Sequence, residues 1–144
     1  MPLPRIGALE SLPVLSHPEL VAPPVHEALK DWPGATEVAV VEIDPAYADT
    51  RADVNNLVKR TLDVRKASFL SMERAVEESA MEYGGITPVG LPETWRVLVD
   101  DACLEIEAAI IGSGVRRSKL LVPGRLLGEL PGAEVLAGLG LMTT

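Results

Sequence analysis

The sequence is poor in aromatic residues and contains only one cysteine. Aromatic residues make up 3% of the 144 positions and are scattered, so no platform for stacking a run of bases is visible and the core must be aliphatic. Cys103, being alone, excludes an intrachain disulfide and a cysteine-based zinc cluster. No apolar run approaches the roughly 20 residues that a membrane-spanning helix needs, and the N-terminus does not resemble a signal peptide. We therefore expect a cytoplasmic protein without a membrane partner.

Basic residues are outnumbered, but they are clustered. The chain carries 13 basic and 21 acidic residues, a formal net charge of −8, which argues against a long basic groove and against DNA as a partner. Seven of the basic residues fall in two short segments: Lys59, Arg60, Arg65 and Lys66 in one, and Arg116, Arg117 and Lys119 in the other. If these segments meet, they could hold a small anion or the end of a nucleic acid; solvated surface charge is the alternative.

The usual catalytic side-chain arrangements are missing. The two histidines are more typical of structural or exposed positions than of a metal site, and Cys103 has no neighbouring histidine. Ser113 lacks the glycine spacing of a nucleophile elbow, and Asp100 and Asp101 would point to opposite sides of a strand. We expect no metal and no cofactor, and an ordinary serine or cysteine hydrolase is disfavoured.

Glycine and proline gather in the stretch MEYGGITPVGLP, residues 81–92. Gly84 and Gly85 permit close approach of another group, and Pro88 fixes the backbone. The pattern therefore predicts a rigid loop whose backbone lies close to another group. The turn Gly112-Ser113-Gly114 could likewise present N–H groups to an anion, although a plain hairpin turn is equally consistent. The sequence predicts a backbone site, in which N–H groups stabilise an oxyanion or a small polar ligand.

The hydrophobic pattern predicts helices interleaved irregularly with strands, hence one domain over residues 1–144 with a mixed sheet flanked by short helices. Pro24 near the start and Pro33-Gly34 after the end bound a first helix. A further helix is capped near Ser71, with Met72, Ala75, Val76 and Ala80 inward and Gly84-Gly85 as its stop. The remaining expected elements are strands within 37–43, 94–100, 105–114, 118–122 and 133–141, a strand at DVRKASF (63–69), a helix after Thr50 with a stripe of Val54, Leu57, Val58 and Leu62, and a short helix beginning at Pro123.

The segment MEYGGITPVGLP, followed by VLVDDACLEIEAAIIGSGVRRSKLLV, resembles the YbaK/prolyl-tRNA editing domain family of aminoacyl-tRNA deacylases. The resemblance extends from about residue 52 to residue 135 and includes a Gly-x-x-x-Pro loop, a strand ending in Asp and a strand ending in Gly-x-Gly. It implies an α/β (α+β) fold with a central mixed, barrel-like sheet, and hydrolysis of the ester between a wrong amino acid and the terminal adenosine of tRNA.

The resemblance also implies the site. Backbone groups of the loop would be catalytic, held rigid by its proline, and basic residues would hold the acceptor end of the aminoacyl-tRNA; a synthetase is a second candidate partner. The implied residues are Gly84, Gly85 and Pro88 for catalysis, Ile86, Thr87, Asp100, Gly112, Ser113 and Gly114 for substrate binding, and Arg116, Arg117 and Lys119 for tRNA binding.

One departure from the family pattern concerns Thr50 and Arg51. The family has further strands and a substrate-contacting lysine in this region, whereas here the two flanking regions join almost directly, so a deletion or a missing segment lies near 50–51. Lys59 and Lys66 are nearby, but neither aligns with that lysine. Two hypotheses therefore stand: a trans-editing deacylase, and a non-catalytic module of the same fold that binds a small ligand, a tRNA end or a synthetase.

Overall fold

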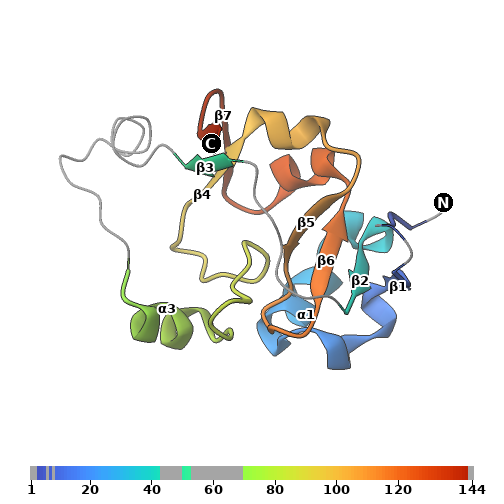
Figure 1. Ribbon diagram of the computed structural model, residues 1–144. Helices are drawn as coiled ribbons and strands as arrows, with labels where there is room; N and C mark the ends of the chain where they lie inside the picture. Colours follow the sequence, from blue (N-terminus) through green and yellow to red (C-terminus); the bar gives the residue numbers. More distant parts are fainter. Residues whose placement is uncertain (1–2, 6, 8, 43–49, 53–69, 143–144) are drawn as a thin grey trace.

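The computed structural model describes residues 3–5, 7, 9–42, 50–52 and 70–142. Its largest sheet has four antiparallel strands in the order β1-β2-β6-β5 (Figure 1). These strands are β1 (Leu12–Pro13), β2 (Ala39–Val41), β6 (Lys119–Val122) and β5 (Ala109–Gly112).

Two further strand pairs accompany the sheet. β3 (Thr50–Ala52) pairs antiparallel with β8 (Gly140–Met142), and β4 (Val97–Asp100) pairs parallel with β7 (Ala133–Leu136). Parallel and antiparallel pairs therefore coexist, which confirms the mixed α+β class. Within the described residues the strands form three separate sheets and do not close into a barrel.

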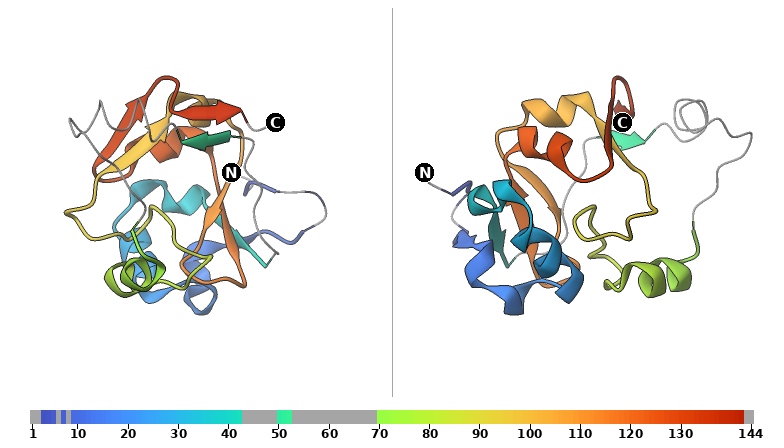
Figure 2. Two further views of the ribbon diagram at one scale, coloured as in Figure 1. Left: turned by 60° about the vertical axis from the view of Figure 1, so that its left-hand side comes forward. Right: turned by 180° about the vertical axis from the view of Figure 1, so that it is seen from behind.

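The first predicted helix is confirmed as α1 (Pro23–Lys30). Two prolines occupy its first turn, where a fixed φ suits the helix and the missing N–H has no partner to lose. The α-helices α1 and α3 (Met72–Ser79) lie at the same end of the molecule in all views (Figure 2). No helix in the described ranges has the length and apolar character needed to cross a bilayer.

Helix α3 begins where the sequence predicts, since Ser71 Oγ accepts from the Arg74 N–H at 3.4 Å. Its end was wrongly predicted: the helix stops at Ala80, which takes a left-handed φ of 58°, four residues before Gly84. The inward stripe is also partly wrong. Met72 is 49% exposed, and the buried residue of the helix is Ser79. A serine can be buried here because its hydroxyl donates to the Ala75 carbonyl.

Strands β4, β5 and β6 lie within their predicted segments, although β4 and β5 begin three and four residues later than predicted, whereas the C-terminal strand prediction needs correction. Residues 133–141 form the parallel strand β7 and part of β8, separated by a turn in which Gly138 has a φ of +74°. The helix predicted after Pro123 is a 3-10 helix, η6 (Gly124–Glu129). The other 3-10 helices are η1 (Val14–Ser16), η2 (Pro18–Leu20), η3 (Pro33–Glu37) and η5 (Asp101–Glu105). The helix expected after Thr50 and the strand at 63–69 lie outside the described residues.

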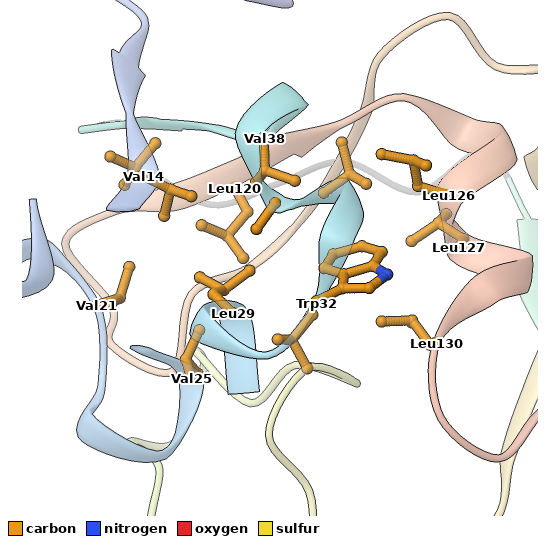
Figure 3. Packing of buried hydrophobic residues seen from close by; sticks show 14 of the residues in the cluster. Val14, Val21, Val25, Leu29, Trp32, Val38, Leu120, Leu126, Leu127 and Leu130 are labelled. Atoms are coloured by element: carbon orange, nitrogen blue, oxygen red, sulfur yellow. The ribbon is translucent and has the colours of Figure 1, made fainter. Parts of the chain in front are cut away.

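The main core lies between the four-stranded sheet, α1 and η6 (Figure 3). Leu120 and Val122 of β6 face this core, whereas Leu121 faces the opposite side with Ala39 and Val41. This alternation along β6 has a consequence for the site, because Lys119 shares the face of Leu121. Labelled core residues in Figure 3 are Val14, Val21, Val25, Leu29, Trp32, Val38, Leu120, Leu126, Leu127 and Leu130.

Candidate functional site

The two glycine-containing segments singled out in the sequence lie against each other. We call residues 84–88 the substrate loop, after the role that the family resemblance predicts for them, and residues 112–114 the glycine turn. The Gly114 N–H donates to the Gly85 carbonyl at 2.7 Å, and the Glu82 N–H donates to the Gly114 carbonyl at 2.9 Å. The Ala22 N–H, just before α1, donates to the Ser113 carbonyl at 3.1 Å. The glycine turn is therefore fixed to both α1 and the substrate loop.

Glycine is required here by close packing of backbone on backbone. A Cβ on Gly85 would lie 2.7 Å from the carbonyl carbon and oxygen of Val115. A Cβ on Gly112 would lie 2.6 Å from the Gly85 oxygen and 2.9 Å from the Ile86 oxygen. Since real Cβ atoms essentially never approach so closely, the loop can pack on the end of β5 and on Val115 only because Gly112 and Gly85 lack side chains.

The hydrogen bonds of the substrate loop determine which N–H groups remain for a ligand. Within the described residues, the Gly85 N–H donates to the Glu82 carbonyl at 2.9 Å and the Thr87 N–H contacts Met81 Sδ at 3.5 Å. No group in these residues accepts from the Gly84 N–H or the Ile86 N–H. In a trans peptide the N–H points opposite to the preceding carbonyl, and the Gly85 carbonyl is bound to the glycine turn. The Ile86 N–H is therefore directed away from the turn.

Ser113 and Thr87, two predicted substrate-binding residues, are buried. Ser113 is 0% exposed, and its Oγ lies 3.0 Å from the Ser118 carbonyl and 2.7 Å from Ser118 Oγ. This hydroxyl is engaged in holding the glycine turn to the start of β6. Thr87 is 1% exposed, and its Oγ1 has no partner among the described residues.

Asp100 has a structural arrangement at the end of β4. Its Oδ1 accepts from the Ala102 N–H at 3.2 Å, which caps η5, and its Oδ2 accepts from the Gly140 N–H at 2.9 Å, which holds β8. Both oxygens are therefore occupied by backbone donors. The nearby Cys103 thiol is disfavoured as a nucleophile, because burial, followed by the charge of Asp100, raises its pKa above the ordinary value.

Pro88 stands between two cavities that it helps to line. One, of about 250 Å³, is mainly apolar and includes Asp100 and Cys103 in its wall. The other, of about 540 Å³, is lined by both tryptophans and the proline-rich end of the loop. Pro88 is half-buried and forms part of the wall of both cavities.

The structure divides the three basic residues assigned to tRNA. Arg116 and Arg117 are exposed beside the glycine turn, and a Cβ on Gly84 would lie 3.6 Å from Arg116 Nε. Arg117 donates to the Glu19 carbonyl. Lys119 differs from both: it is only 6% exposed, and its Nζ lies 3.3 Å from the Gly84 oxygen.

Two features of this arrangement were not predicted from the sequence. One is Glu82, whose carboxylate accepts from the Arg116 N–H at 2.7 Å and whose backbone bonds both Gly85 and Gly114. The other is the burial of Lys119. The burial of Lys119 could have been predicted from the strand SKLLV, since strand alternation places position 119 on the same face as Leu121.

Comparison with known proteins agrees with this architecture. The family model for the aminoacyl-tRNA editing domain matches residues 46–129, more than half of the chain. The chain therefore belongs to the aminoacyl-tRNA editing domain family. No curated protein matches it.

Several solved structures are similar to the chain, among them the following three. The crystal structure of hypothetical protein APE2540 is 27% identical with a TM-score of 0.57, covering 65% of this chain and 60% of that one. A proposed trans-editing enzyme for prolyl tRNA synthetase is 18% identical with a TM-score of 0.65, covering 81% and 97%. A scaffold used for computational grafting of epitope backbones is 18% identical with a TM-score of 0.64, covering 84% and 96%. The last two support the fold alone.

Proposed function

We propose that the chain is a trans-editing aminoacyl-tRNA deacylase, which hydrolyses the ester of a mischarged tRNA. Family membership supports an aminoacyl-tRNA as the substrate. The observation that carries the proposal is the substrate loop, which is docked by its carbonyls so that the Ile86 N–H is left to bind a ligand oxygen. Such a fixed backbone donor is suited to stabilise the oxyanion that forms during ester hydrolysis.

The proposed reaction needs no acid–base side chain of the protein. Water adds to the ester carbonyl carbon, and the Ile86 N–H binds the oxygen on which negative charge develops. The bond between that carbon and the ribose oxygen then breaks, the ribose oxygen takes a proton, and the free amino acid and tRNA leave. The substrate's own neighbouring ribose hydroxyl assists the proton transfer. Asp100 and Cys103 are not needed, since the first is engaged by backbone and the second holds its proton.

Arg116 and Arg117 are proposed to hold phosphates of the acceptor end. Both are exposed, and Arg116 lies directly over Gly84, so an anion bound there would be next to the substrate loop. Contacts at only one end of a tRNA are compatible with a net charge of −8.

The test is deacylation of a panel of mischarged tRNAs by the wild-type protein and two matched glycine variants. Gly84 and Gly138 both have a left-handed φ, +87° and +74° respectively, and neither position has backbone within clash distance of a Cβ. Gly84→Leu and Gly138→Leu therefore share the backbone strain, but only the first places a side chain over the substrate loop. We expect one or two tRNA species to be hydrolysed, with loss in Gly84→Leu and retention in Gly138→Leu. Folded wild-type protein that hydrolyses none would refute the proposal.

The second candidate is a non-catalytic module that binds a small ligand, a tRNA end or a synthetase in the same place. It is favoured by the join at Thr50-Arg51, where the family lysine has no counterpart. Binding of a non-hydrolysable aminoacyl-adenosine analogue without any hydrolysis of the panel would support it. The cytoplasmic location and the single domain over residues 1–144 stay predictions.

A further inference from the structure

Lys119 is a buried charge on an apolar face. Among the described residues it is the one charged side chain with less than 9% exposure, at 6%. It stands opposite Val41 in the β2–β6 register and shares its face with Leu121, and both of these residues are 0% exposed. Lysine is almost never buried unless paired, because its ammonium loses hydration.

Among the described residues, the usual compensation for a buried charge is not found. Within the described residues no carboxylate lies within 4.0 Å of Lys119 Nζ, and its hydrogen bond goes to the Gly84 carbonyl at 3.3 Å. An ammonium group has three donors and seeks negative charge. Its direction toward the first residue of the substrate loop therefore needs an explanation other than an ion pair.

The substrate loop supplies partial negative charge at this place. Gly112 stands opposite Lys119 in the β5–β6 register, and the oxygens of Gly85 and Ile86 lie close above it. Together with the Gly84 oxygen, three successive loop carbonyls are directed toward the ends of β5 and β6. Carbonyl oxygens carry partial negative charge, so three of them close to one another favour a positive charge nearby.

We propose that Lys119 is a positioning residue for the deacylation. Its ammonium holds the Gly84 carbonyl inward and keeps the loop in the arrangement that directs the Ile86 N–H toward the ester oxygen. This inference rests on the proposed function and deepens it. It also replaces the sequence-based role of Lys119, since a buried ammonium that contacts the loop is not available to a tRNA phosphate.

Lys119→Met is the critical variant, because methionine has a similar unbranched length and no charge. Desolvation of a buried ammonium costs more than one hydrogen bond to a carbonyl returns, so we expect an unchanged or raised Tm. We expect kcat at saturating tRNA to fall on the order of 10-fold to 100-fold, with KM within about 2-fold, because the loop loses its anchor and not its phosphate contacts. Arg117→Met is the comparison: removing a phosphate contact raises KM and lessens the salt dependence of tRNA binding.

Three results would overturn the inference. A Lys119→Met variant with raised KM, reduced salt dependence and normal kcat would show a phosphate contact. A lowered Tm with normal kinetics would show a structural role only, and wild-type kinetics with wild-type Tm would show none.

A second readout separates this inference from the proposed function. Amide hydrogen exchange of the segment 82–89 is measured in both proteins, with α1 as internal reference. Faster exchange in Lys119→Met, confined to that segment, is expected whether or not the wild-type protein hydrolyses the panel. If the wild type is inactive, the proposed function fails, and unchanged exchange would then also reject Lys119 as the anchor of the loop.

Discussion

Gly112→Ala tests the contact on which the site depends. Gly112 ends β5, and its φ lies outside the left-handed range, so alanine is compatible with the backbone. The added methyl would lie 2.6 Å from the Gly85 oxygen and 2.9 Å from the Ile86 oxygen, where an ordinary contact begins at 3.4 Å. Both partners are backbone atoms, so the relief cannot come from a rotamer change and the substrate loop itself must move.

The size of the effect follows from this geometry. The loop must withdraw by roughly 0.8 Å, and a misplacement of about 1 Å can reduce a rate on the order of 100-fold. Overpacking of this kind destabilises a protein by typically about 1–3 kcal/mol. We therefore expect Gly112→Ala to stay folded at 25 °C and to lose far more activity than stability.

The assay is steady-state deacylation of the tRNA that the wild-type protein hydrolyses best, with thermal unfolding measured in parallel. Gly128→Ala, in η6, is the matched control. Its Cβ would lie 3.2 Å from Leu104 Cδ2, which is the end of a flexible side chain and can move aside. The control should retain its activity. Equal activity of Gly112→Ala and wild type, at equal Tm, would refute the description of the loop as resting on β5.

Two further predictions concern charge. Reversal of both Arg116 and Arg117 to glutamate should weaken tRNA binding. It should also make the fall of log K with log salt less steep, by roughly 0.7–0.9 for each phosphate that the protein no longer neutralises. An unchanged slope and affinity would remove these residues from the tRNA site. Glu134 forms a two-pronged contact with Arg96 at 2.6 and 2.8 Å, and the hydrogen bonds from Arg96 hold the pKa of Glu134 below 4.5. This stabilisation is present above pH 4.5 and is lost as the pH falls through the lowered pKa, so Arg96→Gln should flatten the decline of Tm in that acidic range; an identical decline in both proteins would contradict it.

The local elements could be predicted where the sequence itself contains the stop signals. Prolines mark both ends of α1, and Ser71 caps α3 through its own hydroxyl. Prediction failed where a residue acts through tertiary context. Ala80 ends α3 with a left-handed φ that alanine rarely adopts, and nothing in the sequence marks it.

The candidate site shows the same division. Glycines at 84, 85, 112 and 114 indicated a backbone site, and their spacing was enough to name both segments, which the fold then brings together. The sequence could not tell which N–H groups stay available, since that depends on hydrogen bonds between residues about 30 positions apart, such as Gly114 with Gly85. Ser113 and Asp100 look like ligand-binding residues in the sequence, but their polar atoms are engaged by the protein's own groups.

Lys119 shows why burial and charge have to be considered together. Charge clustering grouped it with Arg116 and Arg117 as surface residues, whereas strand alternation would have placed it beside Leu121 on a buried face; the second rule was correct. A buried lysine that has no carboxylate partner among the described residues lowers stability, so its presence is best explained by a task that a methionine cannot perform. In a site that depends on backbone N–H groups, the charge then serves the peptide orientation of the loop, which is why we expect kcat to fall without a loss of stability when Lys119 is replaced.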